Sequence, residues 1–264
     1  HQFLISFSIV LSLSICFSSC KKQSGIISQE RNNTLNTVDQ TLSQVDLMYN
    51  QNADSAIGFV FTLIHSDSII NSSLVYYNLI EKLAILKSYS GEIDSSLHYF
   101  TVANNYWEND TSAIGKKHYS STLFNIAYSY YQKGEHKTAI NLFNEVTAYS
   151  EKTNYYQAAV NANILLSNIY ESKEEYGKAL ECIEKSIYLC HQQKDSTSII
   201  PALQSYADLY TNCGLYEEAE QQFNDVMKYQ EHSSPYSIFC YFNGKGRMYY
   251  LQGDYANAIS QFQK

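Results

Sequence analysis

Hydrophobic residues between positions 120 and 151 form two stripes at helical spacing, separated by a short polar break. Members of the first stripe recur every three or four residues, as on one face of a helix: Leu123, Ile126, Ala127 and Tyr130. The second stripe consists of Ala139, Phe143 and Val146. Gly134 stands in the break, where a residue without a Cβ can adopt the left-handed conformation that ends a helix. The pattern predicts two antiparallel helices joined by a tight turn.

The same pattern recurs along the chain as the phrase Tyr-x-x-x-Gly-x-aromatic-x-x-Ala. Its alanines stand at Ala139, Ala179, Ala219 and Ala258. An alanine at this position lets two helices approach closely, because interaxial distance depends on the side chains at the contact. Helix pairs repeated at a fixed period of this length bury their apolar faces only against neighbouring pairs. We therefore predict an all-α fold, an α-solenoid of antiparallel helix pairs.

The repeat units can be placed by register. We expect units near 37–70, 77–110, 120–153, 160–193, 200–233 and 239–264. The first is degenerate, as terminal units often are, with Ala56 in the small-residue position. The last stops inside its second helix, and a solenoid normally ends in a polar capping unit, so we expect the natural protein to be longer.

The units resemble tetratricopeptide repeats (TPRs), most closely in the segment FCYFNGKGRMYYLQGDYANAISQFQK at 239–264. The resemblance implies a right-handed superhelical array that binds protein or peptide partners. The usual period is ~34 residues, whereas the alanines here are spaced by about forty, which predicts longer helices or longer turns between units. Lys245 occupies a normally apolar position of the repeat.

The resemblance also implies that the first helices of successive units line a concave groove. By register, the groove positions are Phe124, Tyr128, Tyr131, Asn161, Ile164, Asn168, Glu171, Gln204, Asp208, Thr211, Asn243, Arg247 and Tyr250. Tyrosines and amides can bind a peptide backbone, and aromatic residues are common hot spots; the alternative is that these residues are solvated surface. Family members that clamp a C-terminal carboxylate use lysine where this chain has Phe124, Ile164, Gln204 and Asn243, so we do not expect that ligand.

The N-terminal residues carry a different signal. Residues 3–17 are apolar, too few for a membrane span, which needs ~20 residues, but typical of the core of a secretory signal. Ser18-Ser19-Cys20 follows and resembles a bacterial lipoprotein cleavage box, which implies that Cys20 becomes the lipidated first residue. We expect a signal peptide at 1–19, a flexible tether at 20–36 and repeats at 37–264, with the protein anchored to the bacterial cell envelope and facing the periplasm or the cell surface. There are two alternatives for this N-terminal segment. One is a plain signal peptide or N-terminal anchor, and the other is a cytosolic apolar helix.

The amino-acid composition restricts the classes of function that the chain can have. The formal net charge is −8 and no basic stripe is visible, which disfavours nucleic-acid binding by this portion. Many of the 25 tyrosines fall on stripe positions, where the ring packs and the hydroxyl reaches water. Four cysteines follow the N-terminal region: Cys182, Cys190, Cys213 and Cys240. They form no C-x-x-C pair, and we expect them to be small buried apolar residues.

Candidate catalytic chemistry is sparse. The histidines are scattered without an H-E-x-x-H motif, and no nucleophile is paired with a base. We predict no catalytic, metal or cofactor site. The function we predict is a non-enzymatic, envelope-tethered scaffold that binds a protein or peptide. The alternative is the extracytoplasmic input part of a longer TPR regulator that carries a helix-turn-helix or histidine kinase module.

Overall fold

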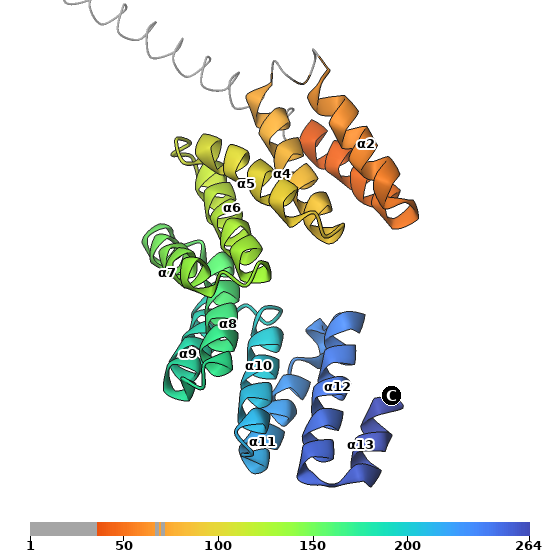
Figure 1. Ribbon diagram of the computed structural model, residues 1–264, viewed down its shortest axis with the longest axis vertical. Coiled ribbons are helices and arrows are strands. Elements are labelled where there is room, and N and C mark those ends of the chain that lie inside the picture. Colours follow the sequence, from red (N-terminus) through yellow and green to blue (C-terminus); the bar gives the residue numbers. More distant parts are fainter. Residues whose placement is uncertain (1–35, 67–68, 70–71) are drawn as a thin grey trace, which may run out of the picture. The chain divides into compact units, whose positions relative to one another are not determined.

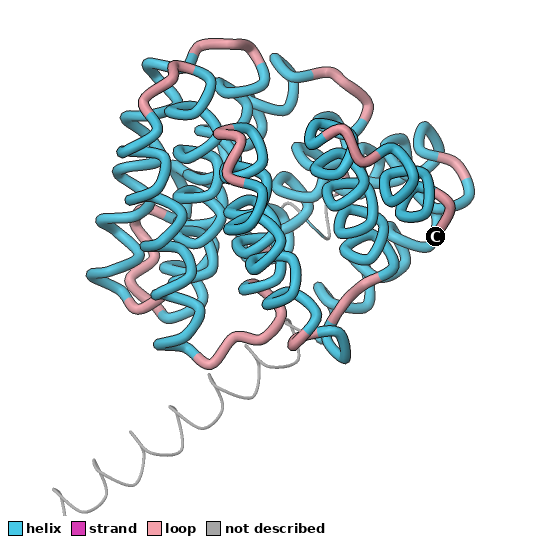
Figure 2. The backbone as a smooth tube through the Cα atoms, turned by 90° about the horizontal axis from the view of Figure 1, so that it is seen from below, coloured by secondary structure: helices cyan, strands magenta, loops and turns pink. Residues whose placement is uncertain are grey.

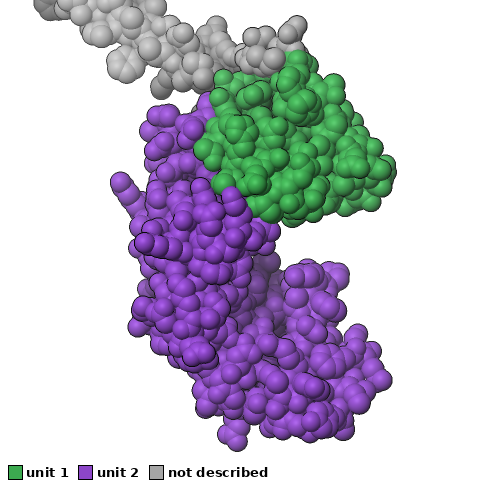
Figure 3. Space-filling view, viewed as in Figure 1, with its two compact units in different colours: residues 1–103 green, residues 104–264 purple. Residues whose placement is uncertain are grey.

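The computed structural model describes residues 36–66, 69 and 72–264. The predicted signal peptide, Cys20 and almost all of the tether lie outside these residues. The described residues form helices joined by short loops and contain no strand (Figure 2). The chain divides into two compact units, residues 1–103 and 104–264 (Figure 3), and the division falls within helix α5 (Ile93–Trp107).

The first unit contains a helix over residues 36–51, α2 (Ala53–Ile64), α4 (Ser73–Tyr89) and the first part of α5. The side chain of Asn52 begins α2 by accepting a hydrogen bond from the backbone nitrogen of Ser55 at 2.8 Å, a typical N-cap. Ala56, in the predicted small-residue position, is fully buried. Helix α2 packs on α4, and Lys82 of α4 forms an ion pair with Asp46 of the first helix.

The second unit is a stack of helix pairs. Its elements are α6 (Ala113–Gln132), α7 (His136–Thr153), α8 (Tyr156–Ser172), α9 (Tyr176–Gln193), α10 (Ile199–Asn212), α11 (Tyr216–Met227), the 3-10 helix η1 (Gln230–His232), α12 (Pro235–Gln252) and α13 (Tyr255–Phe262). From α6 to α13, each α-helix packs on the next. Within this unit α6, α8, α10 and α12 lie on the inner side of a curve, and α7, α9 and α11 lie on its outer side (Figure 1). The predicted all-α solenoid of antiparallel helix pairs is confirmed.

The recurring phrase marks the crossings between helices. Ala139, Ala179 and Ala219 are fully buried, and Ala258 nearly so. Four residues beyond each of the first three alanines, Phe143, Ile183 and Phe223 are also buried. The small residue allows the two helices of a pair to approach, and the large residue one turn later fills the space between pairs.

The turns between paired helices share one backbone conformation. Gly134, Gly214 and Gly253 have φ values of 75°, 74° and 87°, in the left-handed region that glycine tolerates. Glu174 occupies the same position in the second copy of the phrase and has a φ of 62°, so the fold imposes this turn even on a residue with a Cβ. In the α8/α9 pair the additional length lies in the helices, which have 17 and 18 residues. In the next pair α10 and α11 have 14 and 12 residues, and the 3-10 helix η1 lengthens the connection to α12.

The expectation that the four cysteines are buried is correct for Cys190 alone. Cys182 and Cys240 are half-buried, and Cys213 is exposed because it caps the end of α10, where the chain turns through Gly214. All four are free thiols. Burial raises the pKa of Cys190 to about 12 and that of Cys182 to about 11, so neither thiol is ionised near neutral pH.

Lys245 departs from the repeat pattern, and the structure explains how it is accommodated. Its side chain is only 11% exposed, and its Nζ lies 3.2 Å from a carboxylate oxygen of Glu220 on α11. The hydroxyl of Tyr249 donates a hydrogen bond of 2.8 Å to the same oxygen. Burial and this hydrogen bond together raise the pKa of Tyr249 to about 12. The cation at an apolar position is therefore held by one carboxylate that also binds a tyrosine.

We expect Glu220→Ala to lower the free energy of unfolding by about 1–3 kcal/mol, because it leaves the Lys245 ammonium buried without its counter-charge. Lys245→Met removes the cation as well as the need for the carboxylate, and should change the free energy by less than about 1 kcal/mol. Urea denaturation of the two variants measures the difference. A larger loss in Lys245→Met than in Glu220→Ala would contradict this account of the site.

Candidate binding groove

The inner face of the second unit begins with three aromatic side chains of α6. Phe124, Tyr128 and Tyr131 are half-buried, spaced so that they lie along one face of the helix. The ring centroids of Phe124 and Tyr128 are 6.3 Å apart with an interplanar angle of 8°, and those of Tyr128 and Tyr131 are 6.1 Å apart at 27°. The three rings, here called the ring ladder, therefore form a continuous row along α6. Phe124 also packs against the core residue Phe143, and the centroids of the two rings are 5.7 Å apart.

The next helix of the inner face, α8, presents amides and one aliphatic side chain. Asn161, Ile164 and Asn168 are half-buried. Among the described residues, neither the Asn161 nor the Asn168 side chain has a hydrogen-bond partner. Their donors and acceptors are available to a ligand that passes beside the ring ladder.

The inner faces of α8, α10 and α12 are joined by a chain of polar contacts. Arg247 of α12 lies 2.8 Å from Asp208 of α10 and donates a second hydrogen bond, of 3.0 Å, to Asn212. The amide nitrogen of Asn212 in turn donates to the carboxylate of Glu171 on α8. Burial raises the pKa of Asp208, and the Arg247 guanidinium partly opposes that rise. This polar chain, Glu171–Asn212–Arg247–Asp208, contains two carboxylates and one guanidinium, so Arg247 balances one of the two negative charges and Glu171 is held by the Asn212 amide.

Two predicted groove residues are not exposed in the groove. Gln204 is buried, and its amide nitrogen donates a hydrogen bond of 2.8 Å to the backbone oxygen of Ser237. Thr211 is also buried and donates to the backbone oxygen of Ala207. Both side chains serve the packing of α10, because a buried polar group must find a partner inside the protein. In α12, by contrast, Asn243 and Tyr250 are exposed.

Sequence reasoning missed one exposed aromatic residue of α12. Tyr236, in the first turn of α12, has a side chain that is 75% exposed. Its hydroxyl interacts first with Cys240, one turn later, and also with the phenol of Tyr128 on α6; both interactions raise the pKa of Tyr236. The signal was available, because Tyr236 precedes Asn243, the first groove position of α12, by seven residues, which is about two helical turns.

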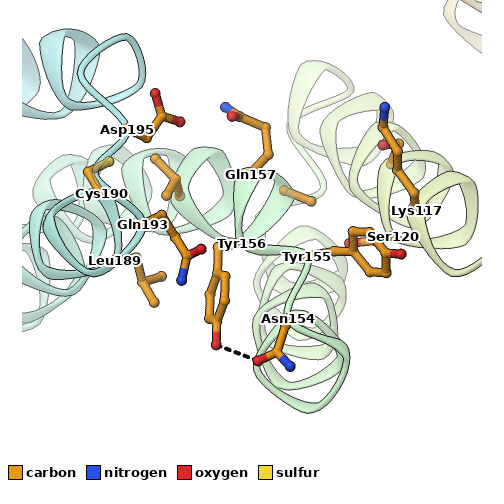
Figure 4. A pocket seen from close by; sticks show the side chains of 13 residues that line it. Lys117, Ser120, Asn154, Tyr155, Tyr156, Gln157, Leu189, Cys190, Gln193 and Asp195 are labelled. Carbon is orange, nitrogen blue, oxygen red and sulfur yellow. Dashed lines mark hydrogen bonds between the residues drawn. The ribbon is translucent and has the colours of Figure 1, made fainter. Parts of the chain in front are cut away.

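A cavity of about 490 Å³ lies at a different place in the unit (Figure 4). Its walls come from the start of α6, the α7–α8 turn, the start of α8 and the end of α9, and include Lys117, Tyr156 and Leu189. Two of the lining residues bond each other, since the hydroxyl of Tyr156 donates a hydrogen bond of 2.7 Å to Asn154. None of the predicted groove residues lines this cavity.

The described ranges contain neither a metal cluster nor a membrane-spanning helix. In residues 36–66, 69 and 72–264, no group of three or more His, Cys, Asp or Glu side chains is arranged to hold a metal ion. Within the same ranges no helix combines the length and the apolar character that crossing a membrane requires.

The stacked helix pairs define the class of protein: an α-solenoid of repeats, an architecture that serves as a protein–protein interaction scaffold and is generally non-catalytic. Residues 120–153, 160–192 and 200–232 match the sequence model of the family described as Tetratricopeptide repeat. These three segments of the chain are tetratricopeptide repeats.

Solved structures of known proteins share this fold. BtubC (BKLC) from P. vanneervenii is 10% identical with a TM-score of 0.60, and the match covers 86% of each chain. A tetratricopeptide repeat protein from Parabacteroides merdae ATCC 43184 is 17% identical with a TM-score of 0.56, over 86% of this chain and 77% of the other. The Rap conjugation gene regulator of the plasmid pLS20, in complex with the Phr* peptide, is 12% identical with a TM-score of 0.60, over 76% of this chain and 55% of the other. These identities establish the fold alone, and no curated protein sequence matches the chain.

Proposed function

We propose that this protein is an interaction scaffold held at the bacterial cell envelope, where the groove of its second unit binds a segment of a partner protein. The observation that supports binding is the inner face itself, where the ring ladder lies beside amides that have no hydrogen-bond partner among the described residues. A few residues supply most of the energy at protein interfaces, and tyrosine is enriched among them. Free amides can bind a peptide backbone. A structure of the same fold was solved in complex with a peptide.

The proposed tether rests on the sequence. An apolar run at 3–17 followed by Ser18-Ser19-Cys20 is typical of an exported lipoprotein, and acyl chains on Cys20 would supply ~0.8 kcal/mol for each methylene buried in the membrane. The repeats would then face the periplasm or the cell surface.

The alternative function is that of the input part of a longer regulator. Sequencing the complete reading frame tests it, because a regulator would encode a membrane helix and an effector domain beyond position 264.

Cys20→Ala is expected to abolish incorporation of radiolabelled fatty acid in the native host and to release the protein from the membrane fraction, because acylation needs the thiol. Cys213→Ala is the matched control, since Cys213 is an exposed free thiol on α10 and its loss should leave the label unchanged. Label that persists in Cys20→Ala, or that is absent from the unmodified protein, would rule out the lipid anchor.

The binding face is tested by a photoreactive benzoylphenylalanine placed at Asn168 on the inner face or, as control, at Tyr188 of α9, which is 60% exposed. We expect a discrete crosslinked adduct in intact cells from position 168 and none from position 188. Adducts at both positions, or at position 188 alone, would mean that the partner does not use the groove.

A further inference from the structure

The cavity of about 490 Å³ in the second unit has the size of a site for a small organic molecule (Figure 4). Such sites usually measure about 300–1,000 Å³ and combine an apolar lining with a few polar groups. The apolar part of this wall consists of Ala158, Val160, Leu189 and Cys190, which are buried side chains of α8 and α9. Because no predicted groove residue lines the cavity, it is a second place at which the unit could hold a ligand.

The corresponding place one repeat later carries larger side chains. Forty residues, the interval of the repeat, separate Val160 from Ile200 and Leu189 from Tyr229. The Tyr229 ring packs against the neighbouring core, and the pocket that it lines has a volume of about 160 Å³. The volume at this repeat position therefore varies with its side chains, and the larger cavity is a property of the residues around α8 and not of the helix-pair fold in general.

The polar groups of the cavity wall leave hydrogen-bond donors available. Oε1 of Gln157 accepts a bond of 2.9 Å from the hydroxyl of Ser198, and Oδ1 of Asn154 accepts one of 2.7 Å from Tyr156. Each amide therefore keeps its NH2 group for a ligand. Lys117, an exposed residue near the start of α6, forms no ion pair within the described part of the chain. These three groups are all donors, and one of them is a cation.

The acidic side chain of the wall, Asp195, is already occupied. Its Oδ1 accepts hydrogen bonds of 3.0 Å from the backbone nitrogens of Thr197 and Ser198. Burial alone would raise the pKa of this carboxyl group, but the bonds from Ser198 and Thr197 outweigh burial and lower the pKa, so Asp195 is negatively charged at neutral pH. Lys117 lies on the opposite side of the cavity (Figure 4). An anionic group of a ligand would therefore lie on the Lys117 side, away from Asp195.

We propose that this cavity binds a small amphiphilic anion, an organic carboxylate whose apolar body packs on Val160 and Leu189 and whose carboxylate lies beside Lys117 and Gln157. Lys117 and Gln157 stand forty residues apart, at the same repeat position of the adjacent helices α6 and α8. Donors at neighbouring positions can share one carboxylate, and hydrogen bonds to an ionised group are stronger than neutral ones. The site is separate from the groove residues, so it stands or fails independently of the proposed partner protein.

The test is titration of the purified chain with phenylbutyrate, naphthoate and decanoate, each compared with the primary amide of the same skeleton. Nuclear magnetic resonance of the Val160 and Leu189 methyl groups reports binding inside the cavity. We expect at least one carboxylate to shift both residues with a dissociation constant of about 1 mM or tighter. Its amide should bind at least about fivefold more weakly, because it lacks the charge that attracts Lys117.

Three variants locate the site. Leu189→Trp places a large ring in the cavity, as Tyr229 does one repeat later, and should weaken binding at least about tenfold when the Val160 methyl groups are observed. Lys117→Gln should weaken binding of the carboxylate at least about fivefold and leave binding of its amide within about twofold. The control is Lys137→Gln, which removes an exposed lysine of α7 outside the cavity and should leave both affinities within about twofold.

Four results would overturn the proposal. They are the absence of methyl shifts with all three carboxylates, an amide that binds as tightly as its carboxylate, binding that is unchanged in Leu189→Trp, and equal effects of Lys117→Gln and Lys137→Gln. Circular dichroism checks that each variant is folded. If Leu189→Trp is unfolded, the comparison of Lys117→Gln with Lys137→Gln decides, because neither substitution changes a buried side chain.

Discussion

Phe143→Ala is expected to lower the free energy of unfolding by about 3–5 kcal/mol. The ring is fully buried in the core formed by α6, α7 and α8. Its removal therefore costs the free energy of transferring the ring from water to the core, and it also leaves a cavity. Urea denaturation followed by far-UV circular dichroism measures the effect. Because each unit contacts only its neighbours, amide hydrogen exchange should show protection lost first in α6 to α8.

The matched control is Phe262→Ala. Phe262 stands four residues after Ala258, as Phe143 stands four residues after Ala139, but its side chain is 52% exposed. The two substitutions therefore remove the same atoms from the same repeat position and differ in burial, and Phe262→Ala should cost less than half as much. If the two substitutions lowered the free energy of unfolding equally, the position in the repeat, rather than burial by the next helix, would determine the cost of removing the ring.

Gly115→Ala is expected to be the most damaging single-methyl change, lowering the free energy of unfolding by about 1–3 kcal/mol. A Cβ at this position would lie 2.3 Å from the backbone oxygen of Asp110 and 2.4 Å from that residue's Cβ, so the loop before α6 must move. That loop also contains Ser112, whose hydroxyl accepts a hydrogen bond of 3.1 Å from the Gly115 nitrogen and begins the helix.

Gly177→Ala in α9 is the control, because nothing lies within 4 Å of the added methyl group. It should raise the free energy of unfolding by up to about 1 kcal/mol through helix propensity.

The measurement uses Trp107, the one tryptophan of the chain, which is buried against the imidazole of His118 with the ring centroids 4.4 Å apart. Its fluorescence should therefore report unfolding of Gly115→Ala at a lower urea concentration than in the unmodified protein. If the Gly115→Ala variant were as stable as the Gly177→Ala variant, the close approach of position 115 to Asp110 would be contradicted.

The fold could be predicted from the sequence because each structural requirement is met locally. A left-handed turn requires a residue such as Gly134, a close crossing requires a residue such as Ala139, and a buried stripe requires apolar residues at helical spacing. Glu174 shows the limit of this rule, since the turn persists there without glycine. The register could still be recognised at that copy, because the aromatic residue and the alanine after the turn were in place.

The groove could be predicted only in part. The register placed Tyr128 and Asn168 on the inner helices, but it could not show that Arg247 is bound to Asp208, 39 residues earlier. Pairing of that kind depends on how neighbouring helices face each other. Gln204 was assigned to the groove because its position faces inward in the family, whereas here the start of α12 covers it through Ser237. The family register also does not include Tyr236, in the first turn of α12.

The polar chain Glu171–Asn212–Arg247–Asp208 joins three successive inner helices, α8, α10 and α12. Hydrogen bonds and ion pairs are directional, so they resist sliding of one helix past the next. Opening the curve of the second unit at these three helices would therefore have to break these contacts.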